Sequence, residues 1–577
     1  MRIARLLTWL PALVADGLLR LHWLLWASGG AAIVLLAVVP FATELIVLNR
    51  ATVDFTFPLD TSLRWAFGHW PHLDYQTPVG IAYWVNQGVA GEILDLSAKS
   101  IFLANIIAAS LIAGAALVLL RRRLASSHAA ILLTGLLALV LSPRGFGDPA
   151  GLISYLAPYN KTGLAALGLL FVAYFVEPRN KAGNKFSGAE SLVAGLLLVW
   201  LIYLKLNFAV IAGAGAIAAL YFAPANRGLV IGSLTLALLG AAGVAVGTGI
   251  GPAYLRDIQV VATVGNVFRP NKLVADLIGS VFALTVFLAA AVVYRLTSHA
   301  PPGVRQENVI VPLGLLTAGI VAMNQVHGNE LPLTFVALVV LSERALREPI
   351  STKATGTRPF SIPLIISGLL VLLSVYQDLK TVNVYVSDQR EGRAIRYCDS
   401  PGTPVCSISY AFFDTHALET LEPFADPALR SAPASKAAVE TFVAQAKSVP
   451  QHLAACDGAP LCALWSVYGE LYELLNLVVV PGDRPYLLGF MNPVPYYYGI
   501  EPPKHVPAWI DMGRTVSAAT HPDADILFSD VALLVVPKTD LAQDYRPGLF
   551  PIYADEIAAR FNTIAETESW SIWRKKP

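Results

Sequence analysis

Long apolar stretches separated by short polar loops fill the first two thirds of the chain, and they restrict this part to helices that cross a membrane. A spanning helix needs about 20 predominantly apolar residues. Only 14% of the 577 residues are charged and 55% are hydrophobic, whereas soluble domains carry roughly 25% charged residues. We predict a polytopic, all-α membrane domain with about eleven spans, at residues 26–48, 100–120, 129–143, 162–177, 189–205, 207–223, 228–250, 274–294, 308–325, 331–342 and 361–379.

The lysines and arginines between these spans indicate the orientation of the chain. Short cytoplasmic loops of membrane proteins carry an excess of Lys and Arg, and basic residues here cluster on alternate loops. The clusters are Arg2 and Arg5; Arg121–Arg123; Arg179, Lys181 and Lys185; Arg227; Arg295 and Arg305; and Arg344, Arg347, Lys353 and Arg358. We therefore expect a multi-pass protein of a bacterial inner membrane, with a cytoplasmic N-terminus and with loops 49–99, 144–161, 205–207, 251–273 and 326–330 outside.

The chain divides into three parts. Residues 1–25 contain Asp16 and Arg20 among apolar residues, which is typical of an amphipathic segment on the membrane surface. Residues 26–379 form the transmembrane domain. Residues 380–577 are richer in charge and have the length of one soluble domain, so we expect a periplasmic α/β domain. Its predicted helices are 436–447 and 555–561, and its predicted strands are the β-branched runs 475–480 and 531–536.

All four cysteines lie in this last part, at positions 398, 406, 456 and 462. Their spacing favours two local disulfides, Cys398–Cys406 and Cys456–Cys462, among the three pairings that four cysteines allow. The alternative is a zinc site with four thiolate ligands, but neither pair has the two-to-four-residue spacing that such sites prefer. Disulfides form in oxidising compartments, which agrees with an extracytoplasmic domain.

The first outer loop combines acidic, aromatic and proline residues. Asp54 and Asp60 follow the first span, and Gly68-His-Trp-Pro-His-Leu-Asp74 and Thr77-Pro-Val-Gly80 lead to the next hydrophobic helix. Carboxylates held near lipid are costly and therefore indicate a functional site. The loop resembles the first loop of GT-C-type integral-membrane glycosyltransferases, the group of protein O-mannosyltransferases and aminoarabinose transferases. In that group an acidic residue follows the first span and a G-x-x-P-[YH]-x-D element comes next.

This resemblance implies a GT-C-like helix bundle with outer juxtamembrane helices and an outer C-terminal domain. It also implies an enzyme that transfers a sugar from a polyprenyl-phosphate donor to a glycan, lipid or protein acceptor on the outer face of the membrane. Transmembrane residues 26–379 would then be the catalytic domain. No cofactor is required, because polyprenyl phosphate is already a fair leaving group, although the chemistry is compatible with a divalent metal. The net charge of +1 argues against nucleic acid as a partner.

Candidate catalytic residues are the first-loop acids. Asp54 matches the family position and is expected to be the general base that takes the acceptor's proton, against the alternative that it caps a helix. Asp60 is the second candidate, although a helix cap before Thr61 is the more common role. Asp74 and His72 are candidate substrate-binding residues, and turn formation or an interfacial position is the alternative for each. His69 and His72 lack a third nearby ligand, so we predict no metal site.

Cations on several outer loops are candidates for binding the donor's phosphate. Lys205 lies at an outward turn between two spans, where a lysine snorkelling to the interface is the alternative explanation. The other candidate residues for the substrate are Arg144, Lys161, Arg269, Lys272 and His327.

Two other classes of function fit a many-span protein. One is a transporter or channel with an outer receptor domain, and the other is a non-catalytic membrane protein that presents the outer domain for assembly. Within the enzymes, the alternative is a glycan ligase or other transferase that moves a larger lipid-linked glycan or phospho-group on a similar scaffold. Transporters place ionisable residues in the middle of their spans. The spans here are nearly free of charge and the polar chemistry lies on outer loops, which favours the glycosyltransferase.

Overall fold

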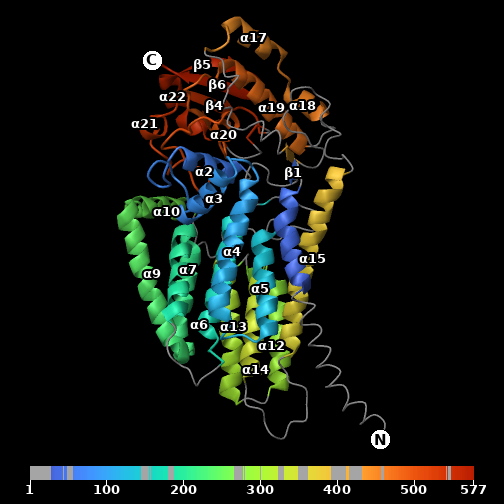
Figure 1. The fold of residues 1–577 in the computed structure, drawn as a ribbon. Coiled ribbons are helices and arrows are strands. Elements are labelled where there is room, and N and C mark those ends of the chain that lie inside the picture. The colour runs from blue at the N-terminus through green and yellow to red at the C-terminus, as the bar shows by residue number, and fades with distance from the viewer. Residues whose placement is uncertain are drawn as a thin grey trace.

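The structure is a computed structural model that describes residues 27–42, 45–48, 56–144, 155, 157–179, 188–265, 274, 277–278, 280–298, 301–322, 331–347, 361–390, 411–414, 432–455, 460–540, 542–543 and 548–577. A bundle of long helices carries a smaller α/β domain at one end, which we call the domain end of the bundle (Figure 1). The bundle helices are Ala27–Phe41, which ends in the 3-10 turn η1 (Val39–Phe41), α4 (Ser100–Leu120), α5 (Ser126–Leu141), α6 (Pro158–Phe175), α7 (Gly188–Leu204), α8 (Leu206–Phe222), α9 (Arg227–Thr248, after η4, Pro224–Asn226), α12 (Val281–Thr297), α13 (Pro302–Ala322), α14 (Leu331–Leu346) and α15 (Ser361–Arg390).

Each of the eleven predicted apolar stretches overlaps one of these helices, but the described helices differ in their capacity to cross a membrane. Three regions are long and apolar enough by length and composition: Ser100–Leu120, Pro224–Thr248 and Ile362–Val384, with mean hydropathies of 2.4, 2.3 and 1.8. Five further apolar helices are shorter. The number of eleven spans therefore remains a prediction, whereas the helical, membrane-type character of the bundle is clear.

Helix α6 forms the centre of the bundle, because every one of its side chains is buried. Helices α4, α5, α7, α8 and α14 pack around it. On the periphery, by contrast, α9 exposes Leu238, Leu239 and Val246. An exposed apolar face of this kind is expected where lipid, and not water, surrounds a helix. The N-terminal turn of α6 is therefore at the bundle axis, and this position matters for the site described below.

Three helices lie outside the bundle at its domain end. These are α2 (Thr56–Ala66), α3 (Ile81–Ile93) and α10 (Gly251–Gly265); α10 runs crosswise over the end of α9, and α2 and α3 lie between the bundle and the α/β domain (Figure 1). The outer juxtamembrane position that the family resemblance implies for such helices remains a prediction. Asp60 lies within α2, which begins at Thr56, so it does not have the helix-capping role that is common before such a sequence.

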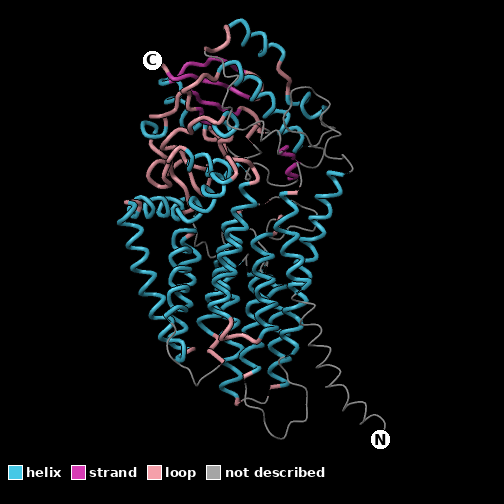
Figure 2. Tube along the Cα trace, in the orientation of Figure 1, coloured by secondary structure: helices cyan, strands magenta, loops and turns pink. Residues whose placement is uncertain are grey.

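The C-terminal domain contains one four-stranded sheet in the order β3-β4-β6-β5, and Figure 2 shows its strands gathered at this end of the molecule. Strand β3 pairs parallel with β4, and β6 pairs antiparallel with β4 and β5. The elements are α17 (Lys436–Gln445), α18 (Val449–Ala455), α19 (Pro460–Val478), β3 (Pro485–Leu487), α20 (Val494–Tyr498), α21 (Ala524–Leu527), β4 (Leu533–Pro537), α22 (Phe550–Arg560), β5 (Phe561–Glu566) and β6 (Trp570–Lys575).

Two sequence predictions about secondary structure are wrong. The run 475–480 forms the last turn of α19 and its exit instead of a strand, because Leu471, Leu474, Leu475 and Val478 have helical spacing and are all buried. The predicted span 26–48 ends at Phe41, just after Pro40, and Leu45–Leu48 instead forms β1, which pairs antiparallel with β2 (Ala411–Asp414). The predicted strand 531–536 and the helix at 436–447 are confirmed as β4 and α17.

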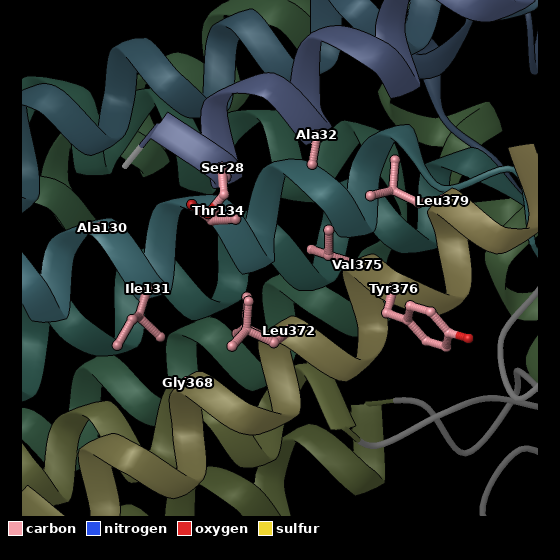
Figure 3. A pocket seen from close by; sticks show the side chains of 12 residues that line it. Ser28, Ala32, Ala130, Ile131, Thr134, Gly368, Leu372, Val375, Tyr376 and Leu379 are labelled. Carbon is pink, nitrogen blue, oxygen red and sulfur yellow. The ribbon is translucent and has the colours of Figure 1, made fainter. Parts of the chain in front are cut away.

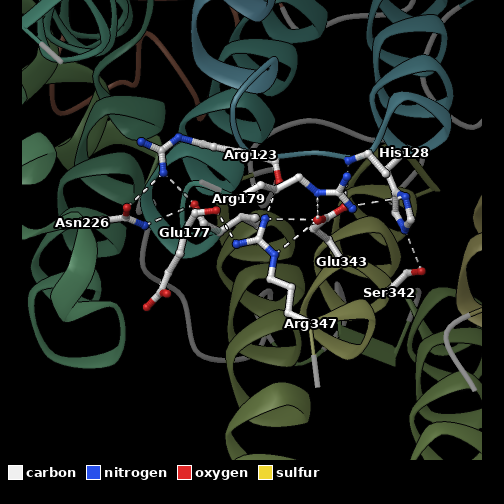
Figure 4. Close-up of polar contacts among 10 residues, drawn as sticks. Arg123, His128, Glu177, Arg179, Asn226, Ser342, Glu343 and Arg347 are labelled. Carbon is white, nitrogen blue, oxygen red and sulfur yellow. Dashed lines mark hydrogen bonds and ion pairs between the residues drawn. The ribbon is translucent and has the colours of Figure 1, made fainter. Parts of the chain in front are cut away.

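The end of the bundle opposite the domain is held by a network of charges around the buried Glu343 and Arg123 (Figure 4). Glu343 of α14 is fully buried and accepts hydrogen bonds from Arg179 at 3.0 Å and Arg347 at 3.1 Å. Arg123 is also buried and contacts Glu190 at 2.6 Å and Asn226 at 2.9 Å. These contacts join the short loops at this end, where the sequence places several of its basic clusters.

Candidate functional site

The candidate site lies at the domain end of the bundle, where one segment of the C-terminal domain is docked on the first outer loop. The backbone amides of His505 and Ala508 donate to the carbonyls of Asp74 at 2.5 Å and Gln76 at 2.8 Å. Lys504 forms an ion pair with Asp74 at 3.0 Å. His69 bonds to Glu501 at 3.0 Å, and Arg484 bonds to the other oxygen of Glu501 at 2.6 Å.

The electrostatics of this contact hold its acids in the charged form. Partial burial opposes ionisation, but hydrogen bonds from His69 and Arg484 lower the pKa of Glu501. In the same way, the Trp70 amide and Lys504 outweigh partial burial and lower the pKa of Asp74. Burial lowers the pKa of His69 despite its bond to Glu501. The predicted binding residue Asp74 is therefore engaged with the C-terminal domain in this structure.

Asp60 is a buried carboxylate, and only one of its two oxygens has a hydrogen-bond partner among the described residues. Its Oδ2 accepts a hydrogen bond from Arg64 Nε one helical turn later, at 2.7 Å. Its Oδ1 is buried and has no hydrogen-bond partner among the described residues. Burial raises the pKa of Asp60, and the neighbouring Arg64 only partly offsets this. A carboxylate whose pKa is moved towards neutrality is better suited to accept a proton.

An aromatic cluster begins one helical turn before Asp60 on the same helix. Phe57 stacks on Tyr83 of α3 with ring centroids 5.5 Å apart, and it meets Trp509 of the C-terminal domain edge-on at 5.0 Å. Tyr159, in the first turn of α6, contacts Phe57 at 6.2 Å and Tyr83 at 5.4 Å. Aromatic faces of this kind can stack on sugar rings. The cluster brings together α2, α3, α6 and the C-terminal domain.

Cations border the aromatic cluster on the bundle side. Lys205, between α7 and α8, places its Nζ 5.5 Å from the centroid of the Tyr159 ring and 3.2 Å from Asn160 Oδ1. The next residue of α6, Lys161, is buried and donates to the Ser142 carbonyl at 2.6 Å. Both lysines thus lie close to the N-terminus of α6, whose dipole also favours an anion.

Arg144 adds a third cation through a buried ion pair with Asp378 of α15. Arg144 Nε donates to Asp378 Oδ1 at 2.7 Å, and Ser142 Oγ donates to the same oxygen at 2.8 Å. Arg144 Nη1 also donates to Gln377 Oε1 at 3.0 Å. Asp378 is only 1% exposed, and its Oδ2 has no partner among the described residues. Lys161, through Ser142, belongs to the same group.

An apolar crevice runs along α15 (Figure 3). It has a volume of about 210 Å³ and lies between the Ala27–Phe41 helix, α5 and α15. Gly368, Val371, Val375 and Leu379 of α15 line it, together with residues such as Ala32 and Ile131. Leu379, the last lining residue on α15, directly follows Asp378 in the chain.

The remaining predicted residues are placed differently or are not described. His72 is buried, bonds to Asp257 of α10 at 2.8 Å and contacts the Tyr254 ring, so it joins the first loop to α10. The structure brings Asp60, Lys205, Lys161 and Arg144 to one end of the bundle. Outside the described residues lie Asp54, Arg269, Lys272, His327, Cys398, Cys406 and Cys456.

The predicted disulfides stay predictions, because Cys462 is described only as part of the α19 backbone. Among the described residues, no group of three or more His, Cys, Asp or Glu side chains is arranged to hold a metal ion.

Sequence reasoning missed Asp378, Tyr159 and Trp509. Asp378 carried a usable signal, because it is the only acidic residue in the predicted span 361–379, and an ionisable residue in a span indicates function. Tyr159 and Trp509 carried none, since an aromatic residue near a membrane interface is ordinary and their meeting depends on the tertiary fold.

The chain matches no protein-family model and no curated protein. Two solved structures are similar to it over 97% of this chain and 98% of theirs: ArnT from Cupriavidus metallidurans in the apo state, with 12% identity and a TM-score of 0.40, and the same protein bound to undecaprenyl phosphate, with 11% identity and a TM-score of 0.39. ArnT is a GT-C aminoarabinose transferase, so these neighbours fall in the group that the first loop resembles. Because both TM-scores are below 0.5, the roles proposed next rest on the residues of this chain.

Proposed function

We propose that the protein is an integral-membrane glycosyltransferase that uses a polyprenyl-phosphate sugar donor on the extracytoplasmic face of the membrane. One observation carries the proposal: a buried carboxylate, an aromatic cluster and three cations adjoin one another at the domain end, beside an apolar crevice. The hydrocarbon, phosphate and sugar parts of a lipid-linked sugar follow one another along the molecule. They need, in the same order, an apolar crevice, cations, and aromatic rings beside a carboxylate.

The donor would bind with its isoprenoid chain along α15 and its phosphate at the cations. The crevice is apolar and extends along α15 to Leu379, the residue after Asp378, so a chain lying in it would bring its phosphate towards Arg144 and Lys161. Arg offers a planar set of donors that suits phosphate oxygens. The sugar would then lie against Tyr159, Phe57 and Trp509.

The reaction would join an acceptor hydroxyl to the anomeric carbon. A first-loop carboxylate, Asp54 or Asp60, takes the hydroxyl proton as the acceptor oxygen forms its bond to that carbon. The bond between the anomeric carbon and the phosphate oxygen breaks, and polyprenyl phosphate leaves with the electron pair. Arg144, Lys161 and Lys205 stabilise the negative charge that develops on the leaving phosphate. The remaining predicted residues, Asp74, His72, Arg269, Lys272 and His327, are proposed to support substrate binding.

The proposal is tested by measuring the release of polyprenyl phosphate from a panel of polyprenyl-phosphate sugars by the purified protein in lipid nanodiscs, with cell-envelope extract as the source of acceptors. We expect release with at least one sugar, dependent on the acceptor. Arg144→Gln should reduce release by about 100-fold, whereas the control Glu556→Gln, at an exposed position of α22, should not change it. A protein that binds or moves the lipid but never releases polyprenyl phosphate would instead be a transporter.

The same proposal places the C-terminal domain in the periplasm. A reporter that fluoresces only in the cytoplasm should stay dark when it is fused after Pro577, and it should fluoresce when it is inserted in the Arg121–Arg123 loop. The opposite pattern would put the site on the wrong side of the membrane for this reaction.

A further inference from the structure

The Asp378 carboxylate has no task in the reaction described above, although it is a buried charge in a helix that faces lipid. It lies in α15, within the region whose composition fits a membrane span, and it is 1% exposed. Its Oδ1 accepts from both Arg144 Nε and Ser142 Oγ. Two cations, Arg144 and Lys161, are buried beside it and would be costly without an anion.

We infer that Asp378 is an internal counter-ion that occupies Arg144 when the site is empty and competes with the phosphate of the lipid for it. A phosphate that contacts Arg144 must either displace the carboxylate from Nε or lie next to it. In both cases the carboxylate opposes the phosphate, because like charges in a buried site repel strongly. Asp378 therefore weakens the binding of polyprenyl phosphate.

Weaker binding has a use in this enzyme. Substrate and leaving group carry the same lipid phosphate, so a site that bound it with the full strength of three cations would release its product slowly. Binding the phosphate equally in all states does not raise the rate of the chemical step. Asp378 compensates the charge of the buried cations when the site is empty. It also limits how tightly the product, polyprenyl phosphate, remains bound.

The inference rests on the proposed function and is tested with undecaprenyl phosphate itself. The wild-type protein and Asp378→Asn are titrated with this lipid in nanodiscs, with native mass spectrometry or intrinsic tryptophan fluorescence as the readout. We expect Asp378→Asn to bind at least about tenfold more tightly, with a lower KM and a lower kcat for turnover. Glu556→Gln is the control, because it makes the same carboxylate-to-amide change at an exposed position of α22, and its affinity should stay within about twofold.

A second comparison covers the case in which Asp378→Asn alone does not fold. Arg144→Gln is compared with the double variant Arg144→Gln, Asp378→Asn, which lacks both members of the pair and so leaves no unpaired charge between them. The double variant should bind the lipid more tightly than the single one, because Lys161 remains without the opposing carboxylate. Equal or weaker binding after the loss of Asp378 in either comparison would overturn the inference. If the wild-type protein itself does not bind the lipid, the proposed function fails instead.

Discussion

At the scale of single residues, the two first-loop acids differ in their surroundings, and substitution separates their roles. Asp54 is expected to be the base on the family pattern, and Asp60 has a buried oxygen without a partner among the described residues and a pKa raised by burial. Replacing the general base by Asn keeps its shape but removes its ability to take a proton. Glycosyl transfer by that variant should fall by at least about 100-fold, as measured by release of polyprenyl phosphate.

The other first-loop variant should be much milder. Lipid binding and expression of both variants serve as controls, since the proton acceptor is not needed for either. A severe defect in Asp60→Asn beside near-normal transfer in Asp54→Asn would assign the base to Asp60, and near-normal transfer in both would refute Asp54 and Asp60 as the base.

Lys205 is the cation nearest to the aromatic cluster, so it reports on the junction between sugar and phosphate. Its Nζ lies 5.5 Å from the centroid of the Tyr159 ring and 3.2 Å from Asn160 Oδ1. Lys205→Ala should weaken donor binding by about tenfold or more, because one charge-assisted contact to the phosphate is lost. The unfolding temperature should change little, since a half-buried cation at a turn adds little to stability. A variant that loses stability but keeps its donor affinity would show that Lys205 only snorkels.

At the scale of helices and strands, the network at the end opposite the domain shows how α14 is fixed to its neighbours. Glu343 is fully buried and contacts Arg179, Arg347 and His128. Glu343→Gln should destabilise the protein by about 2 kcal/mol, because it removes the buried charge that accepts hydrogen bonds from the partly exposed Arg179 and Arg347. The matched control is Glu307→Gln, which removes the half-exposed partner of Arg344 and should cost less than about 1 kcal/mol. Unfolding in detergent measures both, and equal effects would contradict this account.

The elements also show what the sequence could and could not predict. Apolar stretches located the bundle helices, because a lipid-facing helix must be apolar over its whole length, as in α4. Strand β4 was predictable from its β-branched run. The run 475–480 was not, since a short buried apolar segment fits a helix or a strand equally well and only packing decides. Strand β1 could not be foreseen either, because its partner β2 lies more than 360 residues later.

At the scale of the whole molecule, the contact between the C-terminal domain and the first loop should weaken in acid. Burial lowers the pKa of His69 below its usual 6.5, and the pKa values of Glu501 and Asp74 are lowered as well. A group with a lowered pKa in the folded state stabilises fully above its ordinary pKa and loses this effect as the pH falls. The His69 contribution is therefore lost below about pH 6.5 and those of the two acids below about pH 4.5.

Differential scanning fluorimetry between pH 7.5 and pH 5.5 measures the contribution of His69 to the pH dependence of the unfolding temperature. The unfolding temperature of the wild-type protein should fall more than that of His69→Gln, which has no group to titrate there. An identical fall in both proteins would show that His69 does not couple the domain to the loop.

The sequence predicted several of the residues that make up the candidate site, but it did not predict which of them contact one another. Asp60, Arg144, Lys161 and Lys205 came from the loops that the charge pattern placed outside. The sequence could not show that Trp509 of the C-terminal domain meets Phe57, or that Asp378 pairs with Arg144, because both contacts join segments more than 200 residues apart. Tertiary packing alone creates them.

The central claim is that the domain end of the bundle binds a polyprenyl phosphate. A cryo-electron microscopy structure of the protein in nanodiscs with undecaprenyl phosphate tests it most directly. We predict density for the phosphate beside Arg144 and Lys161, with the isoprenoid chain in the crevice along α15 and the aromatic cluster of Phe57, Tyr159 and Trp509 facing the phosphate. Lipid density at the opposite end, with its phosphate at Arg123 or Arg347, or no bound lipid at saturating concentration, would contradict the account.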